Sequence, residues 1–283
     1  MGLADWADSL ADEAARARER AAGLLHGTLR LGVTGLSGAG KTVFITGLVA
    51  GLLARSRMHL LQAEAEGRIE AALLSPQPDP AVPRFAYESH LAALTGGSPH
   101  WPESTRSISQ LRLSLRYRPA GFRGALTGST VLNLDIVDYP GEWLMDLALM
   151  ERDYDTWSRE ALALAESPAR APHAEGWRRA LAAVDPAQDF AEPAAQALAS
   201  AYAGYLGACR AAGLSALAPG RFLMPGEMAG SPALTFAPLP KPARAGRESL
   251  HAEMRARYDA YRHHVVRPFF RDHFARLDRQ VVL

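Results

Sequence analysis

Residues 35–42, Gly-Leu-Ser-Gly-Ala-Gly-Lys-Thr, have the types and spacing of a phosphate-binding loop. They fit G-x-x-x-x-G-K-[ST], in which backbone N–H groups surround a polyphosphate and the lysine contacts its β- and γ-phosphates. Residues 28–34 are typical of a short strand and 43–54 of an apolar helix, whose positive dipole end would point at the same spot. The alternative is an ordinary glycine turn before a core helix. We predict that the nucleotide phosphates are bound by Gly35, Ser37, Gly38, Ala39, Gly40, Lys41, Thr42 and Val43.

Lysine usage supports this interpretation. Only Lys41 and Lys241 are lysines among the 31 basic residues, so arginine has replaced lysine almost everywhere except in the loop. The planar guanidinium of arginine does not substitute for a compact ammonium between two phosphates. We therefore expect Lys41 to act on phosphate charge, both in binding and in catalysis.

A second motif, Asp138-Tyr-Pro-Gly141, follows the apolar-rich residues 130–137 and matches D-x-x-G. In switch GTPases this motif supplies a carboxylate that holds Mg²⁺ through a water and a glycine amide that contacts the γ-phosphate. We expect Asp138 to serve the metal together with the Thr42 hydroxyl, and Gly141 to contact the nucleotide. A simple turn after a strand would look similar.

Glu142 stands directly after that glycine, where Ras-type switches carry a glutamine that orients the attacking water. A carboxylate there could polarise the water, or it could be repelled by the γ-phosphate. It could also be a helix-start glutamate that the dipole favours. We keep Glu142 as a candidate catalytic residue.

Residues 101–106, Trp-Pro-Glu-Ser-Thr-Arg, lie just before a strand-like segment, where a first switch loop is expected. Thr105 is a candidate Mg²⁺ ligand and γ-phosphate sensor, and Arg106 a candidate source of positive charge for the transition state. We include Trp101 and Ser104 among the nucleotide-contacting candidates. The alternatives are that Ser104 caps a local turn, that Arg106 is a surface arginine, and that Trp101 plugs the loop against the core.

The elements around these residues alternate between helix and strand patterns. Residues 111–118 alternate apolar and polar side chains, and with 130–137 they predict an antiparallel hairpin. We expect helices at 58–74 and 85–94, alanine-rich helices from 143 to about 217, a loop with six prolines at 219–242, and a basic helix at 246–266. Pro268 is expected to restart a short helix, and a further strand would begin at Gln280.

The composition bears on the partners and the compartment that we expect for this protein. The net charge of +1 gives no reason to expect a nucleic-acid partner, and a single cysteine, Cys209, is typical of a reducing, cytoplasmic compartment. No stretch reaches the about 20 apolar residues that a membrane span requires. Residues 3–25 predict an amphipathic helix with a mostly alanine face, which favours packing on its own domain over a partner or a weak peripheral membrane contact.

The chain resembles the YcjX-like family of stress-associated P-loop proteins. The resemblance covers the whole length and is carried by residues 35–42, Asp138-Tyr-Pro-Gly-Glu-Trp143, Pro219-Gly-Arg-Phe-Leu-Met-Pro-Gly226 and Ser231-Pro-Ala-Leu-Thr-Phe236. It implies a Ras-like GTP-binding core with a helical insertion after the D-x-x-G, a cytoplasmic location and a link to stress. It also implies that the guanine-reading [NT]-K-x-D motif lies beyond Leu283, since that motif is absent here.

We therefore expect an α/β, Ras-like P-loop NTPase sheet in which the C-terminal part of the nucleotide domain is missing from this chain. The expected parts are an N-terminal helix (1–26), the first part of the core (27–143), a helical insertion with the proline-rich loop (144–245), and a basic helix returning to the core (246–283).

The expected function is Mg²⁺-dependent GTP binding and slow hydrolysis as a switch, with GTP/GDP and Mg as cofactors and the insertion as a candidate surface for a protein effector. The alternatives are an ATP-driven P-loop ATPase or kinase with Glu142 as its base, and a nucleotide-stabilised scaffold with negligible turnover.

Overall fold

The computed structural model describes residues 27–54, 58, 61–103, 106–121, 128–244 and 246–283. The predicted helix at 3–25 lies outside these residues. The chain forms two compact units. Among the described residues, the first unit holds those of 27–34, 40–138 and 277–283, and the second holds those of 35–39 and 139–276.

A five-stranded sheet organises the first unit. Its strands are β1 (Gly27–Thr34), β2 (Ile69–Ser75), β3 (Ser109–Tyr117), β4 (Thr130–Asp138) and β5 (Arg279–Val282), in the order β2-β3-β4-β1-β5. β1 runs parallel to β4 and β5, whereas β2, β3 and β4 are antiparallel neighbours. The predicted hairpin and the strand before the glycine loop are confirmed.

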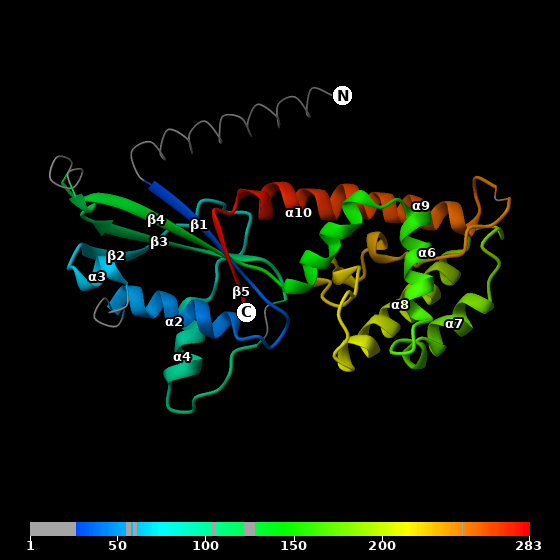
Figure 1. Cartoon of the computed structure of the whole chain (residues 1–283), viewed down its shortest axis with the longest axis horizontal. Helices are drawn as coiled ribbons and strands as arrows, with labels where there is room; N and C mark the ends of the chain where they lie inside the picture. Colours follow the sequence, from blue (N-terminus) through cyan, green and yellow to red (C-terminus); the bar gives the residue numbers. More distant parts are fainter. Residues whose placement is uncertain (1–26, 55–57, 59–60, 104–105, 122–127, 245) are drawn as a thin grey trace, which may run out of the picture. The chain divides into compact units, whose positions relative to one another are not determined.

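The helices α2 (Lys41–Ala54), α3 (Gln62–Ala65) and α4 (Tyr87–Thr95) accompany this sheet. Figure 1 shows α2 along one face of the sheet, with α4 next to α2. The alternating residues Leu111, Leu113 and Leu115 of β3 are buried, and they share a core with Ile45 and Val49 of α2. The period-two pattern of β3 thus buries one face of the strand, as the sequence predicts.

The predicted helix at 58–74 is wrong. Within the described residues of this segment, only α3 is helical, and β2 follows it as an edge strand paired antiparallel with β3. Glu, Ala and Leu favour a helix locally, but pairing Ala72 with Leu115 and Leu74 with Leu113 satisfies the backbone of the segment along the sheet. Tertiary pairing therefore outweighs local propensity at this edge.

The second unit is helical. After the 3₁₀ segment η1 (Gly141–Glu151) come α6 (Tyr154–Ala165), α7 (Glu175–Ala182), α8 (Glu192–Ala211) and α9 (Leu250–Tyr261), labelled in Figure 1. A π-helical turn, η6 (Arg262–Val266), joins α9 directly to α10 (Arg267–Asp272), so Pro268 lies in the first turn of α10 without a break. Short 3₁₀ turns complete the unit: η2 (Ala171–His173), η3 (Gly220–Phe222), η4 (Gly226–Met228), η5 (Pro232–Leu234) and η7 (Phe274–Arg276).

Aromatic side chains form the core of the second unit. Trp157 stacks on Tyr258 with ring centroids 4.9 Å apart, and Trp177 stacks on Tyr205 at 5.2 Å. The Tyr258 hydroxyl donates to the Arg152 carbonyl at 3.0 Å, so its polar end is satisfied inside the core. These ring contacts pack α6 against α9 and α7 against α8.

The proline-rich loop after α8 packs closely against η1. The Gly220 N–H donates to Asp146 Oδ1 at 2.6 Å, and Trp143 Nε1 donates to the Met224 carbonyl at 2.8 Å. A Cβ on Gly220 would lie only 1.7 Å from the Glu142 carbonyl oxygen. Only glycine permits this approach, which holds the segment after the D-x-x-G in place.

We predict that Gly220→Ala lowers the free energy of unfolding by about 1–3 kcal/mol, because the added Cβ must push two backbone segments apart. Urea unfolding measures the change. The matched control is Gly204→Ala on α8, where a Cβ has no neighbour within 4 Å and should leave stability equal or higher. Equal losses in both variants would contradict the close contact at Gly220.

Candidate functional site

The glycine loop joins β1 to α2, as predicted for a phosphate-binding loop. Gly38 and Gly40 adopt φ angles of 84° and 92°, a region that L-residues with side chains rarely occupy. The Ala39 N–H donates to the Leu36 carbonyl at 3.0 Å and closes the turn. The loop residues therefore have the backbone freedom that the motif requires.

Lys41 and Thr42 are the first residues of α2 and are both buried. The Phe44 N–H donates to the Gly40 carbonyl at 2.9 Å, so the helix begins directly at the loop. The positive end of a helix dipole disfavours a cation, and burial adds to that cost. A bound anion would interact favourably with both the ammonium and the helix dipole, which suits the predicted phosphate site.

Asp138 is the last residue of β4 and is buried. Its register partner on β1 is Val33, which lies two residues before the glycine loop. Because β1 and β4 are parallel, their carboxyl ends share one edge of the sheet, where ligands bind in open α/β sheets. The sheet thus places Asp138 beside the end of the strand that leads into the loop.

Gly141 contacts the first residue of the loop. Its N–H donates to the Gly35 carbonyl at 3.0 Å, and a Cβ on Gly141 would lie 2.6 Å from the Gly35 carbonyl carbon. No side chain fits in this space. The glycine of D-x-x-G is therefore required here by close backbone packing.

Glu142 also contacts the loop. Its side chain is only 1% exposed, and Oε1 accepts hydrogen bonds from the Ser37 N–H at 3.1 Å and from Arg210 Nη2 at 2.9 Å. Oε2 is buried and has no hydrogen-bond partner in the part of the chain that the structure describes. The carboxylate thus serves the loop amide rather than the N-terminus of its own 3₁₀ segment.

Arg210, on the last turn of α8, was not predicted as a site residue. The only sequence signal is a basic residue at a helix C-terminus, which the helix dipole explains equally well. Its contact joins residues 68 positions apart, and no spacing rule predicts such a pair.

The predicted switch loop at 101–106 is placed only in part. Ser104 and Thr105 lie outside the described residues. The Arg106 side chain is 78% exposed, and its Nη2 lies 3.8 Å from Glu103 Oε2. The role of Arg106 in catalysis stays a prediction. Trp101 is 76% exposed, so the interpretation that it plugs the loop against the core is wrong.

Asp146 is a further carboxylate in η1, fully buried four residues after Glu142. Its Oδ1 accepts a hydrogen bond from the Gly220 N–H, and its Oδ2 accepts one from the Tyr261 hydroxyl at 2.6 Å. The Arg221 guanidinium stacks 3.3 Å over the Trp143 ring and adds positive charge nearby. Burial outweighs these partners and raises the pKa of Asp146 to about 6.

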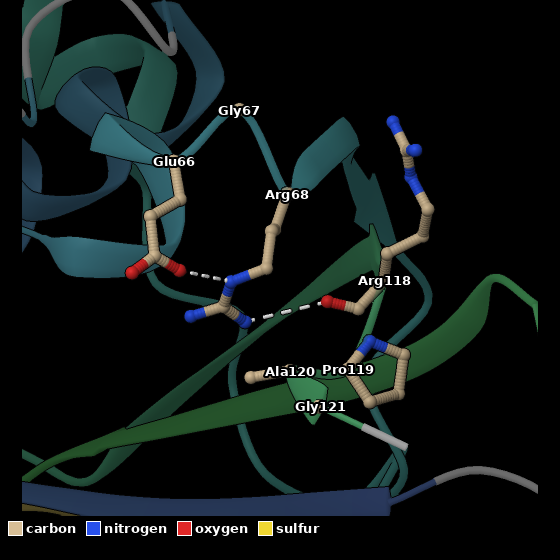
Figure 2. Close-up of a pocket in the computed structure, with 7 residues that line it drawn as sticks. All are labelled: Glu66, Gly67, Arg68, Arg118, Pro119, Ala120 and Gly121. Atoms are coloured by element: carbon tan, nitrogen blue, oxygen red, sulfur yellow. Dashed lines mark hydrogen bonds and ion pairs between the residues drawn. The ribbon is translucent and has the colours of Figure 1, made fainter. Parts of the chain in front are cut away.

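Other features do not join this site. A pocket of 410 Å³ in the first unit is lined by Glu66–Arg68 and Arg118–Gly121, and Figure 2 shows the Arg118 guanidinium pointing away from the Glu66–Arg68 ion pair. Among the described residues, no group of three His, Cys, Asp or Glu side chains could hold a metal, and no helix is long and apolar enough to cross a membrane. His263 and His264 are exposed.

The first unit combines helices with a mixed β-sheet. A glycine loop joins β1 to α2, and an aspartate ends β4, the parallel neighbour of β1. This arrangement is consistent with a P-loop NTPase-like fold. The chain belongs to the YcjX-like family, DUF463, whose sequence profile matches residues 29–283.

Two relatives carry the name Ras-like GTPase YcjX. The protein from Escherichia coli K12 is 41% identical over 267 residues, which covers 90% of this chain and 57% of the relative. The protein from Shewanella oneidensis MR-1 is 39% identical over 293 aligned residues, which covers 94% of this chain and 60% of the relative. The chain thus spans less than two thirds of the length of these relatives.

Asp146 should make stability fall as pH rises. The unfolded carboxyl has a pKa of 3.8 and the folded one about 6, so the folded state binds the extra proton between these values. That contribution is present below pH 3.8 and is lost through pH 6, by up to about 3 kcal/mol. Asp146→Asn cannot ionise, so the difference in free energy of unfolding, unmodified minus variant, should fall from pH 4 to 7 in urea titrations. Parallel pH profiles would show that Asp146 does not titrate in this range.

Proposed function

We propose that this protein binds GTP and GDP with Mg²⁺, hydrolyses GTP slowly and works as a conformational switch. The observation that carries the proposal is the contact of the D-x-x-G segment with the glycine loop, through Gly141 to Gly35 and Glu142 to Ser37. The names of the two relatives support a GTPase. A cytoplasmic location and an association with stress are proposed from the family resemblance.

The phosphates bind the loop amides and the Lys41 ammonium. The loop lies between a strand and a helix N-terminus, so its N–H groups and the dipole act on the same anion. Lys41, buried at the start of α2, adds a full positive charge where water is excluded.

The residues at the end of β4 and the start of α2 fit a magnesium ion. The Thr42 hydroxyl and the Asp138 carboxylate are hard oxygen donors, which Mg²⁺ prefers along with phosphate oxygens and water. Both side chains are buried. Thr105 is the proposed third protein ligand. When bound, the metal would neutralise charge on the phosphate oxygens.

Gly141 is the proposed sensor of the γ-phosphate. Its N–H donates to Gly35 here, so a γ-phosphate that takes this N–H must displace that bond and move η1. Because η1 is held by Gly220 and Met224, the displacement would reach the loop after α8. Glu142 Oε2, which has no hydrogen-bond partner among the described residues, is the proposed acceptor of a hydrogen bond from the attacking water, and Arg106 would supply charge in the transition state.

The organisation of the whole protein is also a proposal. The helices between 144 and 245 would form an insertion in a Ras-like nucleotide domain and present a surface to a protein effector. The [NT]-K-x-D motif that reads the guanine base is not among the residues of this chain.

Nucleotide competition tests the base specificity. With a fluorescent GTP analogue bound at saturating Mg²⁺, unlabelled GTP and GDP should displace it at concentrations where ATP does not. Fluorescence anisotropy reports the displacement. Equal competition by ATP would overturn the guanine assignment and favour an ATPase.

We predict that Lys41→Ala weakens triphosphate binding by roughly 100-fold or more, since a buried charge-assisted contact to phosphate is lost, typically worth ~3 kcal/mol. The matched control is Lys241→Ala, which removes the other lysine, an exposed partner of Asp155 at 2.8 Å. Anisotropy titration measures both, and circular dichroism checks folding. A folded Lys41→Ala protein with unchanged triphosphate affinity would remove the loop from the proposed site.

A further inference from the structure

Glu142 and Arg210 form an ion pair that ties α8 to the phosphate loop. Both contacts of the carboxylate use the same oxygen: Oε1 accepts from the Ser37 N–H of the loop and from Arg210 Nη2. Glu142 is 1% exposed, whereas Arg210 is 34% exposed. Water therefore cannot solvate the carboxylate, and the arginine is its charged partner within the described residues.

A carboxylate anchored on this loop creates an electrostatic problem. The proposed ligand brings several negative charges to the same backbone, and like charges a few ångströms apart repel strongly where water is excluded. A triphosphate suffers more than a diphosphate because its γ-phosphate adds charge. The carboxylate must either leave the loop or be neutralised in place.

We propose that Arg210 is a positioning residue that neutralises Glu142 and lets its carboxylate stay on the Ser37 amide while a triphosphate is bound. Arg210 thereby sets the preference for triphosphate over diphosphate from the end of α8. This inference rests on the proposed nucleotide binding, but it concerns a residue and a contact outside both sequence motifs.

The pair has the geometry for this role. Arg210 contacts Oε1, the oxygen already on the loop, while Oε2 is buried without a hydrogen-bond partner among the described residues. The arginine lies on a 20-residue helix whose side chains Leu198, Tyr202 and Tyr205 are buried in the aromatic core. Its backbone is thus held by the packing of the second unit rather than by the loop.

The test compares the affinities for a non-hydrolysable GTP analogue and for GDP in four forms of the full chain: unmodified, Arg210→Ala, Glu142→Gln and the double variant. In Arg210→Ala, the ratio of triphosphate to diphosphate affinity should fall about 10-fold, equivalent to ~1.4 kcal/mol. In the Glu142→Gln background the same substitution should leave the ratio unchanged, because no carboxylate remains to be neutralised. The loss should shrink at high salt, since Arg210 is partly exposed.

Two further variants separate charge from packing. Arg210→Lys keeps the charge and should recover much of the ratio, whereas Arg210→Gln removes the charge but keeps part of the side chain and serves as the test if Arg210→Ala fails to fold. Arg159→Ala on α6 removes an exposed arginine of the same unit and should change nothing.

Equal weakening of both nucleotides by Arg210→Ala, or the same loss in the Glu142→Gln background, would overturn the role of Arg210 while nucleotide binding stands. If the unmodified protein binds neither nucleotide, the proposed function fails and the inference fails with it.

Discussion

The hydrogen bonds between the segment after β4 and the glycine loop are the constraint on which the rest of this structure depends. Gly141 donates to Gly35, and Ser37 donates to Glu142, so two residues after the strand are fixed to two residues of the loop. The first bond requires glycine at 141, because a Cβ would meet the Gly35 backbone. The second bond buries a carboxylate, which must then find further partners. The segment after β4 is bonded in turn to the loop after α8, and Glu142 pairs with Arg210 on α8 itself.

The packing around η1 explains how a short 3₁₀ segment can hold a fixed position. Regular helices gain stability from an uninterrupted hydrogen-bond ladder, which 3₁₀ segments make less well. Here the support comes from the side: Trp143 donates to Met224, and Asp146 accepts from Gly220 and Tyr261. A buried carboxyl with a pKa of about 6 is costly, but its bonds are directional and define one register between η1 and the proline-rich loop. If η1 moves, it must therefore either break these hydrogen bonds or move together with the residues that it bonds.

Local patterns in the sequence predicted those parts of the fold that local physics determines. The loop at 35–42 is confirmed between a strand and a helix, because glycine spacing and the flanking apolar runs specify that arrangement. The hairpin of β3 and β4 follows from its alternating side chains. The strand β2 was missed because its residues favour a helix and only its partner β3 makes it a strand. Arg210 was missed for a similar reason: its role depends on a contact 68 residues away, and Gly220 looks like any other loop glycine until its neighbour is known.

A glutamate rather than a glutamine after the D-x-x-G changes which parts of the protein the proposed site needs. A glutamine could accept the Ser37 hydrogen bond as a neutral amide, and it would need no charged partner on α8. The Glu142 carboxylate is 1% exposed, and Arg210 at the end of α8 pairs with it at 2.9 Å, which offsets part of the cost of burying a charge. The charge on residue 142 thus makes the helical unit part of the electrostatics of the loop. The ion pair therefore connects the loop to α8, and a displacement of the carboxylate would leave Arg210 without this partner.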